Sequence, residues 1–73
     1  MQRKQTKSDI TRSKILAAAE VEFSEKGYFG ARVDEIALAS GVNKRMIYQH
    51  FGNKDGLYKE TLISVYRKLS ECE

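Results

Sequence analysis

The chain has 73 residues, with 13 Lys and Arg against 10 Asp and Glu, one His, one Cys, and neither Pro nor Trp. This length accommodates one small domain and excludes a two-domain enzyme. Cys72 is the single Cys and cannot form an intramolecular disulfide, which excludes disulfide scaffolds and indicates a reducing compartment. One Cys and one His cannot supply the four ligands of a structural zinc ion, which excludes zinc fingers. The longest apolar run, residues 15–19, is too short to span a membrane. We therefore expect a soluble intracellular module without metal or cofactor.

Charge is distributed unevenly along the chain. Residues 1–14 hold five basic side chains against one acidic, residues 15–42 hold two against five, and residues 43–59 hold four against one. Two basic blocks thus flank an acidic one. Clustered Lys and Arg neutralise phosphates, so a polyanion-binding surface is one interpretation. The alternative is a basic tail beside an ordinary solvated helix face.

After a polar segment over residues 1–9, which we expect to be a flexible basic arm, apolar residues recur at helical spacing. A first helix is predicted over residues 10–26, with Ile15 and Phe23 on its apolar stripe. Gly27 is its expected left-handed stop. Four aromatic residues are predicted to lie in the core or at its rim: Phe23, Tyr28, Phe29 and Phe51.

Three further helices are predicted. The second covers residues 33–40, and the third covers residues 43–51 with Asn43 as its N-cap. The fourth begins at Asn53, and its apolar stripe continues almost to the last residue, from which we expect the chain to continue or to have been cut. The β-branched residues never alternate, so no strand is predicted. The fold class is therefore all-α.

The junction between the second and third helices is typical of a helix-turn-helix. Relative to Gly41, Ile36 and Ala37 lie five and four residues before, and Val42 and Ile47 lie one and six residues after. A left-handed glycine at the joint and a small residue one turn earlier allow two helices to cross closely. The spacing thus predicts a DNA-binding helix pair. The alternative, a simple helix end between packed helices, remains open.

Helical phase separates two faces of the third helix. Ile47 and Phe51 share one face, whereas Arg45 and Gln49 lie on the opposite arc. Arg pairs with guanine O6 and N7, and Gln pairs with adenine N6 and N7. Met46 either meets a thymine methyl or fills the seam between helices. The candidates for contacts with DNA bases are Lys44, Arg45, Met46 and Gln49.

Three strings of residues together are specific for one family. They are Ile15-Leu16-x-Ala18-Ala19-x-x-x-Phe23-x-Glu25-x-Gly27-Tyr28, Val33-x-x-Ile36-Ala37-x-x-x-Gly41-Val42, and Tyr48-x-His50-Phe51-x-x-Lys54-Asp55-x-Leu57. Because of these strings, residues 11–57 resemble the N-terminal DNA-binding domain of tetracycline-repressor-type (TetR family) transcriptional regulators. Two departures are Ala31, where the family usually has Thr, and Arg45, where it usually has a small residue.

The resemblance implies sequence-specific binding of duplex DNA, with the recognition helix, about residues 43–51, in the major groove. It implies five phosphate contacts, by Arg32, Asn43, Tyr48, His50 and Lys54. It also implies three segments: the arm over 1–9, a helix-turn-helix domain over 10–57, and the start of a linker helix over 58–73. No nucleophile or acid–base pair can be assembled from the spacing, so we expect no catalytic residue and no enzyme.

A regulator of this family implies partners outside the chain. The expected partners are a palindromic DNA operator, a second copy bound through a missing C-terminal domain, and a small-molecule effector held by that domain. The expected setting is the cytoplasm of a bacterium, on the nucleoid, with repression as the expected sense of regulation. The alternative of another class is a helical protein-interaction module whose basic patch is incidental.

Overall fold

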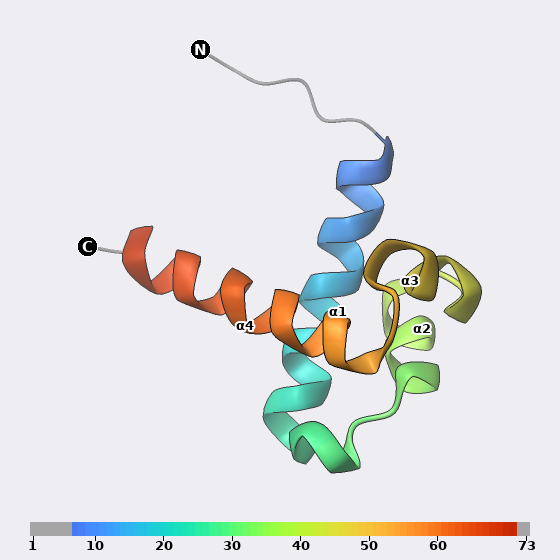
Figure 1. The fold of residues 1–73 in the computed structure, drawn as a ribbon, viewed down its shortest axis with the longest axis horizontal. Helices are drawn as coiled ribbons and strands as arrows, with labels where there is room; N and C mark the ends of the chain where they lie inside the picture. The colour runs from blue at the N-terminus through green and yellow to red at the C-terminus, as the bar shows by residue number, and fades with distance from the viewer. Residues whose placement is uncertain (1–6, 72–73) are drawn as a thin grey trace.

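A computed structural model describes residues 7–71 of the chain. These residues form four helices and no strand: α1 (Lys7–Gly30), α2 (Val33–Ser40), α3 (Lys44–Phe51) and α4 (Lys54–Glu71). Helices α2 and α3 lie together beside α1, and α4 crosses α1 (Figure 1). The all-α prediction is confirmed. Most of the predicted arm, together with Cys72, lies outside the described residues.

Helix α1 begins three residues earlier than predicted, and its regular part ends at Gly27, where the sequence predicted its end. A kink at Gly27 separates it from one further helical turn up to Gly30. Gly27 has φ 73° and ψ 177°, so it breaks the regular helix with an extended ψ rather than with the left-handed conformation we predicted. The chain then resumes a helical turn, and the Ala31 N–H donates to the Gly27 carbonyl at 3.0 Å.

Local capping explains the remaining helix boundaries. Helix α2 has its predicted bounds and ends at Gly41, which is left-handed at φ 74° and ψ 13°. The Asn43 side chain accepts a hydrogen bond from the Met46 N–H at 2.8 Å, which fixes the start of α3. Asn53 does the same for α4, accepting from the Gly56 N–H at 2.7 Å. The Asn43 cap is the one that the sequence predicted, and Asn53 caps α4 at the position where the sequence predicted its start.

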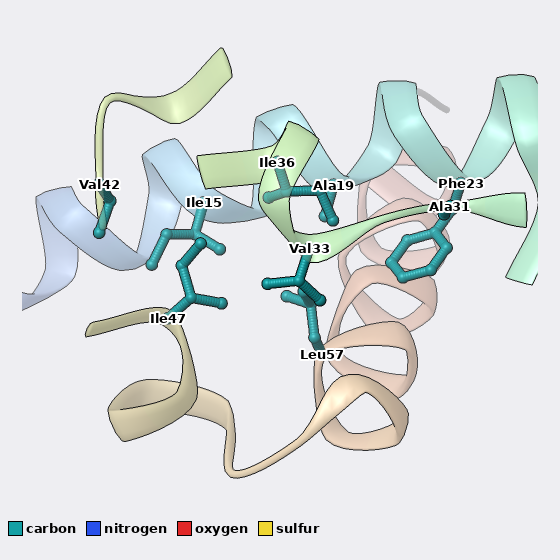
Figure 2. Close-up of a cluster of buried hydrophobic side chains, with 9 residues drawn as sticks. All are labelled: Ile15, Ala19, Phe23, Ala31, Val33, Ile36, Val42, Ile47 and Leu57. Atoms are coloured by element: carbon teal, nitrogen blue, oxygen red, sulfur yellow. The ribbon is translucent and has the colours of Figure 1, made fainter. Parts of the chain in front are cut away.

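The core receives one fully buried aliphatic side chain from each helix: Ile15, Ile36, Ile47 and Leu57. Figure 2 shows Ile15 of α1 and Ile47 of α3 pointing toward each other, with Leu57 of α4 beside Val33 of α2. Burying such a side chain contributes about 1.5–3 kcal/mol. Ile47 therefore holds α3 against the rest of the domain.

Packing of α4 against the end of α3 depends on Gly56. A Cβ built at Gly56 would lie 2.1 Å from the Phe51 carbonyl oxygen, so only glycine fits at this approach. Polar contacts tie α4 to α1 as well. Arg12 forms an ion pair with Glu60 and lies 5.2 Å from the centroid of the Phe51 ring. Arg12 thus contacts α4 and the last residue of α3 at once.

One aromatic prediction is wrong. Phe29 is 94% exposed and is not among the residues packed against the core, although its ring centroid lies 5.2 Å from that of Tyr28. The break at Gly27 turns the following residues away from the apolar stripe of α1, so Phe29 does not continue it. Phe23 is buried, and Tyr28 and Phe51 are partly buried, as predicted.

The second half of α4 extends beyond the other helices (Figure 1). Its apolar side chains are exposed: Leu62, Ile63, Tyr66 and Leu69. One ion pair near its end reaches back to α1, from Lys68 Nζ to Glu20 Oε2 at 2.7 Å. No helix within residues 7–71 is long and apolar enough to cross a membrane.

Candidate nucleic-acid interface

Helix α3 presents a polar face opposite its buried one. Ile47 is completely buried, whereas the four residues predicted to contact bases are exposed: Lys44, Arg45, Met46 and Gln49. Met46 is 38% exposed and lies outside the buried core, so its side chain is available at the surface. The sequence therefore correctly predicted which side of α3 is buried and which side is exposed.

The predicted phosphate contacts are distributed over three structural positions. Asn43 and Arg32 are exposed and precede the first turns of α3 and α2. Tyr48 and His50 are half-buried on α3, where Tyr48 packs against the core and the His50 ring lies 6.1 Å from that of Phe51. Lys54 is half-buried and is the first residue of α4. These five residues therefore come from α3, from the start of α4 and from the residues that precede α2 and α3.

An ion pair that the sequence did not indicate joins α2 to α3. Lys44 Nζ lies 3.0 Å from Asp34 Oδ1, and both side chains are more than half exposed. A shallow depression between them is lined by Gly41 and Val42. Asp34 is in the first turn of α2, so it lies beside the start of the candidate recognition helix.

The pKa of Lys44 is raised above its ordinary value of 10.5, chiefly by the hydrogen bond to Asp34 and then by the charge of that carboxylate. Partial desolvation and the positive charge of Arg32 lower the same pKa, and Tyr48 raises it. The pKa of Lys44 thus responds to two residues that the sequence assigned to phosphate contacts, Arg32 and Tyr48.

The start of α2 is capped from another helix. Arg32 is the N-cap residue but makes no side-chain cap, and its backbone N–H donates to Glu22 Oε2 at 3.1 Å. This bond is the main reason that the pKa of Glu22 lies below its ordinary value of 4.5, and Lys26 at 3.2 Å lowers it further. Glu22 of α1 thus supplies a hydrogen bond where Ala31 has no hydroxyl to offer.

Lys54 is held by the end of α1. Its Nζ lies 4.8 Å from the centroid of the Tyr28 ring, a cation–π distance. The Tyr28 hydroxyl donates to Asp55, which raises the pKa of Tyr28 above its ordinary value of 10.0. The sequence predicted that Tyr28 lies in the core or at its rim, but it did not indicate that Tyr28 contacts Lys54 and Asp55 at the start of α4.

Residues 7–71 contain no group of three or more His, Cys, Asp and Glu side chains placed to hold a metal ion. The chemical groups gathered around α3 are instead long hydrogen-bond donors of Lys, Arg and Gln, with one carboxylate among them.

Proteins with similar sequences are transcriptional regulators. The HTH-type transcriptional repressor NicS of Pseudomonas putida is 38% identical over 66 residues, covering 90% of this chain and 31% of NicS. The HTH-type transcriptional activator FasR of Mycolicibacterium smegmatis is 44% identical over 54 residues, covering 74% of this chain and 25% of FasR. This chain therefore spans about a third or less of the length of these relatives.

Solved structures share the arrangement of the helices. A crystal structure from Mesorhizobium loti, assigned to the TetR family of transcriptional regulators, superposes with a TM-score of 0.90 at 32% identity and covers 93% of this chain and 34% of that one. HlyIIR, a hemolysin II transcriptional regulator, gives a TM-score of 0.72 at 39% identity, covering 74% and 30%. The family described as bacterial regulatory proteins, tetR family, matches residues 15–61. The resemblance predicted from the sequence is thus confirmed, and this chain belongs to the tetR family of bacterial regulatory proteins.

Proposed function

We propose that this domain binds duplex DNA sequence-specifically, with α3 in the major groove, as the DNA-binding part of a transcriptional repressor. The observation that carries the proposal is the two-sided construction of α3. Ile47 fixes one side in the core, and Arg45 and Gln49 on the other side are exposed and make no hydrogen bond or ion pair within residues 7–71. A rigidly held helix with unengaged planar donors is suited to base edges.

Base reading is assigned to four side chains of α3. Arg45 donates to guanine O6 and N7, Gln49 makes paired bonds with adenine, and Met46 contacts a thymine methyl. Lys44 is the fourth, and its Nζ lies at the first turn of the helix, where recognition helices meet base edges. Arg45 is the residue that distinguishes this surface from that of relatives with a small side chain there.

Phosphate contacts are assigned to residues on both sides of α3. Arg32, exposed at the N-cap of α2, is assigned to a phosphate, and Tyr48 is assigned to donate its hydroxyl to a phosphate oxygen. Lys54 begins α4, whose free N–H groups also favour a phosphate. Asn43 and His50 complete the set. These contacts position the domain and carry no sequence information.

The three segments keep their predicted roles in this proposal: a basic arm over 1–9 that follows the backbone, the helix-turn-helix domain over 10–57, and a linker helix from 58 onward. The relatives are roughly three times as long as this chain. For the whole regulator we propose a C-terminal domain that forms a homodimer on a palindromic operator and binds a small-molecule effector. The setting is the bacterial cytoplasm. NicS supports repression, and FasR shows that a related domain also serves an activator.

The experiment is fluorescence anisotropy with random duplex DNA at about 50 mM and about 200 mM salt. A domain that neutralises two phosphates, with Arg32 and Lys54, loses affinity by about 10-fold over this range. Lys54→Gln should reduce both the affinity and the salt dependence. Lys59→Gln is the matched control, because Lys59 is an exposed lysine of the same helix with no assigned contact. A protein-interaction module would bind little at either concentration, and that result would overturn the proposal.

A further inference from the structure

The Lys44–Asp34 ion pair places a carboxylate beside the proposed base-reading helix. Phosphates repel a carboxylate, so Asp34 weakens binding to DNA in general unless it meets a hydrogen-bond donor there. The major groove offers such donors on bases only, at cytosine N4 and adenine N6. An acidic side chain on this surface therefore favours some base pairs over others.

The two charged groups together present a donor next to an acceptor, 3.0 Å apart from Lys44 Nζ to Asp34 Oδ1. A Watson–Crick G·C pair presents the complement, guanine O6 beside cytosine N4, and these atoms are separated by a hydrogen-bond distance because they bond to each other. An ammonium has three N–H donors and a carboxylate about four acceptor sites, so both groups can keep their mutual bond while contacting the base pair.

We propose, on the basis of the proposed DNA-binding function, that Asp34 is a specificity-determining residue and that Lys44 and Asp34 read one G·C base pair as a unit. Lys44 donates to guanine O6 and N7, and Asp34 accepts from cytosine N4. An A·T pair also has a donor beside an acceptor, at adenine N6 and thymine O4. In an A·T pair, however, the thymine methyl takes the place of guanine N7, and a methyl group cannot accept a hydrogen bond from the Lys44 ammonium.

The position of the pair in the fold supports this assignment. Lys44 is the first residue of α3, and Asp34 lies in the first turn of α2, and both side chains are more than half exposed. Both residues line a shallow depression together with Gly41 and the exposed Leu38, so the pair is reached from solvent. Glu35, the neighbouring acid, makes no ion pair within residues 7–71.

The test begins with selection of bound half-sites from a random duplex library, using the 73-residue chain at micromolar concentration. Each base pair of the selected site is then replaced in turn, and affinities are measured for the unmodified chain, Asp34→Asn, and Glu35→Gln. The two variants are matched, because each removes one negative charge from the first turn of α2. Only Asp34→Asn removes the negative charge that pairs with Lys44.

The expected result is one G·C pair whose replacement lowers the affinity of the unmodified chain by about 5- to 150-fold. In Asp34→Asn this penalty falls by about threefold or more, because the carboxylate that accepts from cytosine N4 is replaced by a weaker, neutral acceptor while Lys44 keeps its contact with guanine, and in Glu35→Gln it is unchanged within about twofold. Lys44→Gln should erase the penalty at the same base pair, which tests the unit without altering α2.

Several results would overturn the inference. One is that the loss of affinity on replacing each base pair is the same in the unmodified chain and in Asp34→Asn. Another is that Glu35→Gln changes the loss at the G·C pair as much as Asp34→Asn does, which would indicate a general charge effect. Coupling of Asp34 to an A·T pair would overturn the G·C assignment. If the unmodified chain binds duplex DNA with the expected salt dependence and one of these results is found, the inference fails and the proposed function stands. If the chain selects no sequence and does not bind, the proposed function itself fails.

Discussion

Lys54 Nζ lies 4.8 Å from the centroid of the Tyr28 ring, and the hydroxyl of the same tyrosine donates to Asp55. One side chain from the end of α1 therefore holds the first two residues of α4. In the proposed function Lys54 contacts a phosphate, so Tyr28 acts as a positioning residue for that contact.

Removal of the Tyr28 hydroxyl should change how stability depends on pH. The pKa of Tyr28 is raised above 10.0, so the neutral hydroxyl is favoured in the folded state. Its stabilising effect is fully present below 10.0 and is lost as the pH rises through the raised value. Urea unfolding of the chain and of Tyr28→Phe should differ most at about pH 8, and the difference should shrink as the pH rises above 10.0. A difference that is constant over this range would contradict the hydrogen bond to Asp55.

Gly56→Ala should destabilise the domain severely. The new Cβ would lie 2.1 Å from the Phe51 carbonyl oxygen, and this atom belongs to the backbone, so α3 and α4 must separate. We expect a loss of about 3 kcal/mol or more in the free energy of unfolding, measured by urea denaturation. Gly30→Ala is the control, because there the new Cβ meets only the Lys26 side chain, at 3.3 Å. Equal effects of the two substitutions would contradict the observed approach of the helices.

Truncation of Ile47 should release α3 from the core. Ile47→Val should cost about 0.5–1.5 kcal/mol and Ile47→Ala about 2–5 kcal/mol. A domain of this size is stable by about 4–11 kcal/mol, so Ile47→Ala leaves it close to unfolding. Circular dichroism during urea titration measures both changes. Met46→Ala, at the exposed neighbour, should change the free energy by less than about 0.5 kcal/mol.

Local sequence signals predicted the parts of this fold that depend on neighbouring residues. Asn43 caps α3 because its own side chain reaches the N–H three residues later, and Gly41 ends α2 because glycine tolerates a positive φ. The apolar spacing around Ile47 predicted which side of α3 is buried, because helical periodicity needs no tertiary information.

The remaining features depend on residues brought together by folding. Asp34 and Lys44 are ten positions apart, and their ion pair depends on the crossing of α2 and α3, which spacing does not specify. Gly56 lies inside a helix, where glycine is unfavourable, and its role becomes clear only from the approach of the Phe51 carbonyl at the end of α3. Phe29 was predicted to lie in the core or at its rim, but it follows the break at Gly27 and is exposed to solvent.

Substitutions on the polar face should separate positioning from reading. Lys54→Ala and Tyr48→Phe should weaken binding to all duplexes by similar factors, because phosphate contacts carry no sequence information. Arg45→Ala or Gln49→Ala should cost about 1–3 kcal/mol on the selected site and much less on mismatched DNA. Anisotropy with both duplexes measures the two losses. Equal loss of affinity in Arg45→Ala on both duplexes would make Arg45 a phosphate contact.

The most direct test of the account is to map where duplex DNA touches the chain. Backbone and side-chain amide signals of the ¹⁵N-labelled chain are followed by NMR during titration with duplex DNA, first at low and then at high salt. We expect the largest shifts at Arg45, at the Gln49 side-chain amide and at Lys44, with reversal as salt is added. Shifts confined to the exposed apolar face of α4 around Tyr66, or no shifts at all, would contradict the assignment of α3 to the major groove.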